Sequence, residues 1–174
     1  AYSPHQKEAY EAFKYADEKG VLLIHAAGND AKDIDVEPNY PTSMYSFQTE
    51  PLDHFVTIGA STKNKGAEMV ASFSNYGAKG VDVFAPGFEI YNTVPQSEYM
   101  NLQGTSMAAP MVAGAAAMLK SYFPELSMKE IKEALYSSSV RYPKVAGFSD
   151  KSVTGGVINI YNAAKVCKKL AKKK

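Results

Sequence analysis

The 174-residue sequence predicts an α/β fold in which helices flank a parallel sheet. Three observations lead to this prediction. Residues 21–24 (VLLI) form a continuous aliphatic run, which is typical of a strand buried on both faces of a parallel sheet. A helical pattern that ends at Gly20 comes directly before this run. Two further apolar runs, residues 55–60 and residues 81–84, predict additional strands of the same kind.

The first predicted helix begins at Ser3 and Pro4, because a capping hydroxyl is followed there by a residue whose missing N–H is not needed. Its apolar residues recur at steps of three and four: Ala9, Ala12, Phe13 and Ala16. Between the first two strands, residues 30–54 contain three prolines and little periodicity. We expect a long loop there, and loops of that length are usually functional.

The second half of the sequence predicts a hairpin followed by helices. Residues 89–94 and 98–102 are expected to pair around a turn at Pro95. Residues 106–120 predict a helix that is apolar on every face and therefore buried all round. Ser127 and Glu130 then match a capping box that opens an amphipathic helix.

The sequence closes with a short strand at residues 157–158 and a helix from about Tyr161. We find no internal repeat and no linker, so residues 1–174 are expected to form a single domain. Six lysines lie within residues 165–174, and we interpret this lysine-rich end as a solvated helix tail.

Charge and apolar run length argue against two classes of partner. Lys plus Arg number 19 and Asp plus Glu 18, a balance that gives no indication of nucleic-acid or membrane binding. The longest apolar stretch, residues 107–119, is shorter than the ~18 residues that a membrane-spanning helix needs. We therefore expect no nucleic-acid partner and no membrane span.

Metal binding is not predicted. The single cysteine, Cys167, excludes an internal disulfide and a cysteine zinc site. Acids alternate at residues 33, 35 and 37, as at the start of a calcium-binding loop. However, Pro38 stands where such a loop requires glycine, and Met44 where it requires glutamate. We interpret these acids as solvated.

Two polar residues could perform chemistry. Ser106 lies at the start of the apolar helix, where its own backbone N–H has no helical partner and the helix dipole is positive. Asn29 follows the strand at residues 21–24, at the edge where α/β folds bind ligands. Together these groups could stabilise an oxyanion if Ser106 attacked a carbonyl. The alternative is that Ser106 caps a core helix and Asn29 closes a turn.

The motifs around these residues resemble those of the subtilisin-like serine peptidases. Residues 104–110 (GTSMAAP) with 112–114 (VAG) resemble the nucleophile signature, and residues 26–29 (AAGN) resemble the oxyanion-hole segment. Other similar segments are residues 73–77 (FSNYG), 83–87 (VFAPG) and 155–159 (GGVIN). The resemblance implies a subtilisin-like sheet flanked by helices.

The resemblance also implies roles for individual residues. Ser106 would be the acyl-forming nucleophile, and Asn29 and the Ser106 N–H would donate to the oxyanion. The pocket for the residue before the scissile bond would be lined by Ala26, Ala27 and Gly28. The family usually has histidine where this sequence has Met111, at a position thought to be structural.

The family's aspartate and histidine motifs are not found here. None of the three histidines, His5, His25 and His54, is followed by glycine. We disfavour His25 as a general base and expect it to be partly buried and hydrogen-bonded. The sequence is therefore interpreted as the C-terminal half of a catalytic domain, cut before the first predicted helix and inert or nearly so alone, because Ser106 lacks a base.

The intact parent is expected to be a serine endopeptidase with peptide or protein substrates, and its other half would be a partner of this chain. No cofactor is required; calcium is common in the family, but its tighter sites would lie outside this sequence. The resemblance implies an extracellular or periplasmic location. We also expect the strand at residues 21–24 to have an open edge, which two copies could cover as a homodimer.

Other functions remain alternatives. A non-catalytic relative could use the groove as a peptide- or protein-binding module. An α/β-hydrolase is disfavoured because residues 104–108 (GTSMA) lack the closing glycine of a nucleophile elbow. A dinucleotide-binding fold is disfavoured because no G-x-G-x-x-G motif follows a strand.

Overall fold

A computed structural model describes residues 5–64, 66, 68–145 and 147–174. The predicted helix start at Ser3 and Pro4 lies outside these residues. The elements in chain order are α1 (Gln6–Glu18), β1 (Leu23–Ala26), β2 (Phe55–Ser61), β3 (Val83–Pro86), β4 (Ile90–Val94), η1 (Pro95–Ser97), β5 (Glu98–Leu102), α2 (Thr105–Tyr122), α3 (Met128–Ser137), β6 (Val140–Arg141), η2 (Ser149–Lys151), β7 (Gly156–Val157) and α4 (Ile160–Ala171).

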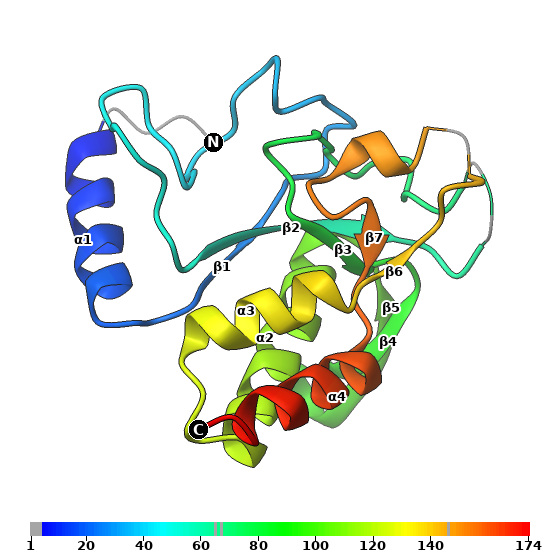
Figure 1. The fold of residues 1–174 in the computed structure, drawn as a ribbon. Helices are drawn as coiled ribbons and strands as arrows, with labels where there is room; N and C mark the ends of the chain where they lie inside the picture. The colour runs from blue at the N-terminus through cyan, green and yellow to red at the C-terminus, as the bar shows by residue number, and fades with distance from the viewer. Residues whose placement is uncertain (1–4, 65, 67, 146) are drawn as a thin grey trace.

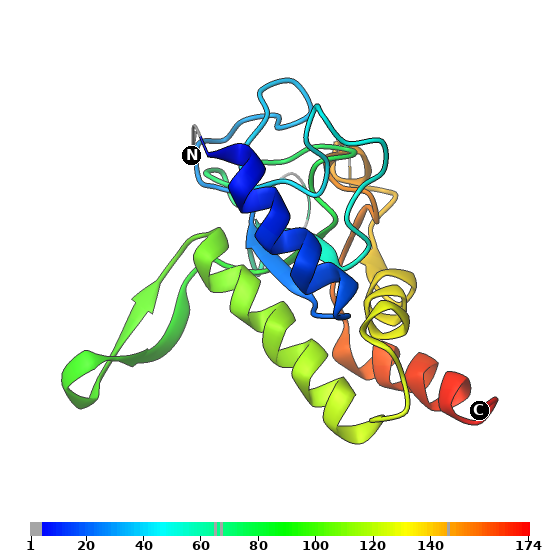
Figure 2. The same ribbon diagram turned by 90° about the vertical axis from the view of Figure 1, so that its left-hand side faces the viewer.

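The predicted α/β architecture is confirmed. The main sheet has the order β1-β2-β3-β7-β6, in which the first four strands are parallel and β6 is antiparallel to β7. Helices α2, α3 and α4 lie together on one side of this sheet (Figure 1). The β4–β5 hairpin forms a separate two-stranded sheet that projects from the body (Figure 2).

The core lies on both faces of β2 and β3. On the helical face, apolar residues of these strands pack with α2, α3 and α4 in one buried cluster. On the other face, Phe84 packs against Phe148, with ring centroids 5.4 Å apart. Gly59 pairs with Phe84 across the strands, and a Cβ at Gly59 would clash with the Phe84 ring. The glycine therefore makes room for this aromatic ring.

Two local signals in the sequence are confirmed at helix ends. Gly20 follows α1 with φ +71°, a left-handed conformation that suits glycine. At the start of α3, the Glu130 N–H donates to Ser127 Oγ at 3.2 Å and the Ser127 N–H donates to Glu130 Oε2 at 2.7 Å.

The prediction that the helix at residues 106–120 is buried all round is wrong. One side of α2 is buried, through Thr105, Ala108, Val112, Ala115, Ala116 and Leu119. On the opposite side Met111 is 37% exposed and Met118 is 50% exposed. Only one side of the helix faces the sheet, so half of an apolar helix is left open to solvent.

The first strand is also less buried than predicted. It begins at Leu23 rather than at residue 21, and all four of its residues are only half-buried. The reason is that β1 is the edge strand and, among the described residues, pairs with β2 alone. Within the described ranges, no helix combines the length and the apolar character needed to cross a membrane.

Candidate active site

The two predicted site residues come together at the carboxyl ends of the parallel strands. Asn29 lies three residues after the end of β1, and Ser106 is the second residue of α2. Both side chains are exposed to solvent. The structure therefore brings together two residues that are 77 positions apart in the chain.

Thr105 joins the two segments. Its backbone N–H and its hydroxyl both donate to Asn29 Oδ1, at 2.9 and 3.0 Å. Its hydroxyl oxygen also accepts from the Gly28 N–H at 3.1 Å. Because a backbone N–H can only donate, the oxygen of the Asn29 carboxamide must face Thr105, and its Nδ2 must face the other way. Sequence reasoning gave Thr105 no role of its own.

The backbone of Gly104 lies beside both the Asn29 carboxamide and the Ser106 backbone nitrogen. A Cβ at Gly104 would lie 3.4 Å from Asn29 Nδ2 and 3.6 Å from the Ser106 backbone nitrogen. Both nitrogens therefore border the same small space, which is open because Gly104 has no side chain. The Ser106 N–H is among the first amides of α2, which the helix itself cannot satisfy. Two N–H donors at one point can stabilise an oxyanion.

Two asparagine side chains donate hydrogen bonds to the segment before Asn29. The Ala27 carbonyl accepts from Asn39 Nδ2 at 2.8 Å and from Asn75 Nδ2 at 2.9 Å. Asn75 is buried, and its Oδ1 accepts from the N–H groups of Asp30 and Lys32 at 3.0 Å each. These bonds fix the loop that presents Asn29. Asn75 lies in the segment FSNYG, but its contacts could not be read from that motif.

Ser106 opens into a cleft of about 260 Å³ between α2 and the projecting hairpin. The cleft is lined by Ile90, Asn92, Thr93, Leu102, Ser106, Met107, Pro110 and Met111. These side chains are neutral, so this lining provides neither a base for the Ser106 hydroxyl nor a carboxylate.

The histidines of this chain lie elsewhere. His54 Nδ1 is 3.1 Å from Asp17 Oδ1, a contact between α1 and the residue that precedes β2. His5 is exposed beside Glu8 on α1. His25 lies in β1, and its Nδ1 is buried without a hydrogen-bond partner among the described residues. Our expectation that His25 is hydrogen-bonded through its ring is thus wrong for this nitrogen.

Burial lowers the pKa of His25 from 6.5 to about 4. A side chain with this pKa is neutral at physiological pH, but it lines the small cavity with Asn39 and Thr57 and not the cleft at Ser106. The structure therefore gives His25 no contact through which it could serve as the base for Ser106.

The alternating acids at 33, 35 and 37 have structural contacts. Asp35 accepts through Oδ1 from the Gly80 N–H at 2.6 Å, and Asp33 Oδ1 accepts from the Asp35 N–H at 3.0 Å. Our interpretation that these acids are simply solvated is incomplete, since Asp35 stabilises the turn before β3. In the part of the chain that the structure describes, no group of three His, Cys, Asp or Glu side chains is placed to hold a metal ion.

Comparison with known proteins identifies one family. The family model described as the Subtilase family matches residues 2–161. The sequence is 32% identical over 162 residues to Subtilisin-like protease 2 of Plasmodium falciparum, covering 89% of this chain and 11% of that protein. It is 35% identical over 147 residues to Subtilisin DY of Bacillus licheniformis, covering 83% of this chain and 47% of that protein.

Solved structures show the same likeness in three dimensions. The Prenylagaramide maturation protease PagA is similar with a TM-score of 0.72 at 27% identity, over 91% of this chain and 55% of that one. A structure of the subtilase cytotoxin SubAB has a TM-score of 0.78 at 24% identity, over 96% of this chain and 56% of that one. The chain thus spans about half, or less, of the length of the proteins it matches.

Proposed function

The chain belongs to the Subtilase family, and on that premise we propose that it carries the nucleophile and the oxyanion-binding groups of a serine endopeptidase. Ser106 is the nucleophile, and Asn29 Nδ2 and the Ser106 N–H are the oxyanion donors. The observation that supports this proposal best is that both nitrogens border the space above Gly104.

The geometry supports the following reaction. Ser106 Oγ attacks the carbonyl carbon of a peptide bond, and the carbonyl electrons move to its oxygen, which accepts from Asn29 Nδ2 and the Ser106 N–H. Collapse of this intermediate expels the amine and leaves an acyl-enzyme, which water then hydrolyses. Ala26, Ala27 and Gly28 are proposed to line the pocket for the residue before the scissile bond.

The reaction needs a base that takes the Ser106 proton and returns it to the leaving amine. Because no histidine lines the described cleft, we propose that the base and its aspartate come from a separate half of the catalytic domain. The open edge of β1 and the exposed side of α2 provide an apolar surface on which that half could pack. Without it, the present chain is expected to be inert or nearly so.

One observation favours a second candidate function. A cleft lined by neutral side chains would also suit a relative that binds peptides without cleaving them, as a peptide- or protein-binding module. Under either function, family membership supports a location outside the cytoplasm.

Labelling with a fluorophosphonate tests the proposal, because this probe reacts with activated serines. We expect Ser106 to be labelled in the intact parent and not in the 174-residue chain alone. The variant Ser106→Ala should abolish labelling of the parent, whereas Ser72→Ala, a serine outside the cleft, should not. Equal labelling of chain and parent would reveal a base within this chain, and an unreactive but folded parent would favour the binding module.

A further inference from the structure

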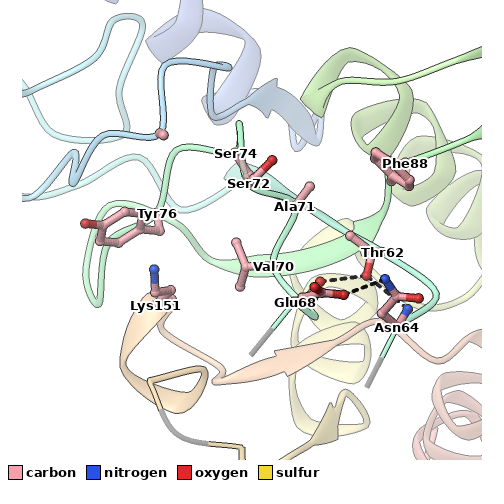
Figure 3. Close-up of a pocket in the computed structure, with 11 residues that line it drawn as sticks. Thr62, Asn64, Glu68, Val70, Ala71, Ser72, Ser74, Tyr76, Phe88 and Lys151 are labelled. Carbon is pink, nitrogen blue, oxygen red and sulfur yellow. Dashed lines mark hydrogen bonds between the residues drawn. The ribbon is translucent and has the colours of Figure 1, made fainter. Parts of the chain in front are cut away.

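A second and larger pocket of about 570 Å³ opens at the carboxyl ends of the parallel strands (Figure 3). Its walls come from the segments that follow β1, β2 and β3, from residues 68–76 and from η2. The lining residues are Ala31, Thr62, Asn64, Glu68, Val70, Ala71, Ser72, Ser74, Tyr76, Phe88 and Lys151. We call this the Lys151 pocket. Its position is the one at which α/β folds bind ligands.

The Lys151 pocket begins close to the proposed oxyanion site. Ala31 follows Asn29 by two residues, and its N–H donates to the Phe73 carbonyl at 2.9 Å. On the other side, Phe88 follows Gly87, whose carbonyl accepts from the Gly104 N–H at 2.8 Å. A polypeptide that crosses the site could therefore continue into this pocket.

The charges in the Lys151 pocket are separated. The ammonium of half-buried Lys151 lies 3.7 Å from the centre of the Tyr76 ring. At the opposite end, Glu68 Oε2 accepts from Asn64 Nδ2 at 3.0 Å (Figure 3). None of the salt bridges among the described residues includes Lys151. An aromatic face only partly replaces the water lost by a cation, so this end of the pocket favours an anionic group.

Resting on the proposed peptidase function, we propose that the Lys151 pocket binds an acidic side chain of the substrate on the leaving-group side of the scissile bond. The proposed pocket for the residue before the scissile bond has a wall formed by Ala26 to Gly28. This wall lies at the end of the edge strand β1. The Lys151 pocket touches the segment after β1 only at Ala31, and most of its lining comes from the segments after β2 and β3, further into the sheet. A substrate chain that enters at the end of β1 and passes over Ser106 would therefore place the residues after the cleaved bond in the Lys151 pocket.

Binding to the 174-residue chain tests this proposal without requiring catalysis. The probes are two blocked pentapeptides, acetyl-Ala-Ala-Glu-Ala-Ala-amide and its glutamine counterpart, and binding is followed by amide chemical shifts. We expect the glutamate peptide to bind roughly tenfold more tightly, with shifts at Ser72, Ser74 and Phe88. Equal affinity for the two peptides would overturn the proposal.

Variants distinguish a specific contact between Lys151 and the glutamate from a general attraction of the acidic peptide to a positively charged protein. Lys151→Met should remove the preference for glutamate, and Lys151→Arg should retain most of it. Lys168→Met, which removes one positive charge from the exposed face of α4, should leave the preference unchanged. A loss of preference in Lys168→Met equal to that in Lys151→Met would contradict the assignment.

The intact parent distinguishes failure of this proposal from failure of the peptidase function. If the parent cleaves peptides but kcat/KM is the same with glutamate or glutamine after the scissile bond, the pocket assignment is wrong and the peptidase function stands. If Ser106 is unreactive in a parent that still binds the glutamate peptide through Lys151, the peptidase function is wrong and the pocket remains a site for acidic peptides.

Discussion

At the scale of single residues, Thr105 determines how the oxyanion-binding amide is oriented. It donates twice to Asn29 Oδ1 and accepts once from the Gly28 N–H, and it is buried itself. One residue, through its backbone N–H and its hydroxyl, thus fixes both the direction of Asn29 Nδ2 and the backbone before it. Without these hydrogen bonds, the carboxamide of Asn29 could rotate and present its oxygen, which would repel an oxyanion.

We predict that Thr105→Val destabilises the chain and impairs the site. Valine keeps the shape but removes the hydroxyl, so the part-buried Gly28 N–H loses its acceptor and Asn29 loses one donor. The free energy of unfolding should fall by about 1–3 kcal/mol, measured by urea denaturation. Thr105→Ser retains the hydroxyl and should stay within about 1 kcal/mol of the wild type. A valine variant as stable as the wild type would show that these two bonds contribute little.

A second prediction concerns His25 and pH. Burial lowers its pKa from 6.5 to about 4 in the folded chain, so the unfolded chain binds a proton at a higher pH than the folded chain does. The contribution of His25 to stability is therefore complete above pH 6.5, decreases as the pH falls from 6.5 towards 4, and changes little below that.

Urea denaturation at several pH values tests the direction of this pH dependence of stability. The wild type should lose more stability between pH 6.5 and pH 4 than His25→Leu does, whereas exposed His5→Gln should follow the wild type. If His25→Leu and the wild type show the same pH dependence, His25 is not buried as the structure describes.

At the scale of elements, the apolar patterns predicted the positions of helices and strands better than they predicted which faces of those elements are covered by other elements. The helix at residues 106–120 is observed as α2, yet its exposed side carries Met111 and Met118. Likewise, the run at residues 21–24 gave no sign that β1 would lie at the edge of the sheet. Apolar character is a property of the segment itself, whereas coverage depends on which other elements pack against it.

The same distinction applies to the site. Ser106 and Asn29 could be placed together from their motifs and from the common edge of parallel strands. The supporting contacts of Thr105 and Asn75 could not, because each is a hydrogen bond between side chain and backbone of segments far apart in sequence. The Lys151 pocket was also missed, since its walls come from five separate segments with no shared motif.

At the scale of the whole molecule, two surfaces are left uncovered next to each other, one of unpaired strand backbone and one of apolar side chains. They are the open edge of β1 and the exposed side of α2, and α2 packs directly against β1. The Leu23 N–H donates to the carbonyl of His54, just before β2, and the Ala27 N–H donates to that of Ile58 within β2. By alternation, the amides of Ile24 and Ala26 point towards the open edge. A strand edge with free amides beside apolar side chains favours association.

We propose that two copies of this chain cover the β1 edge as a homodimer when the other half of the domain is not bound. Sedimentation equilibrium at high micromolar concentration should then show a dimer. Ala26→Pro removes one outward N–H and should yield monomers, while Met118→Lys, on the exposed side of α2, should not. Because both partners would compete for one surface, adding the other half should also dissociate the dimer. A monomeric wild type, or a dimer broken only by Met118→Lys, would contradict pairing through β1.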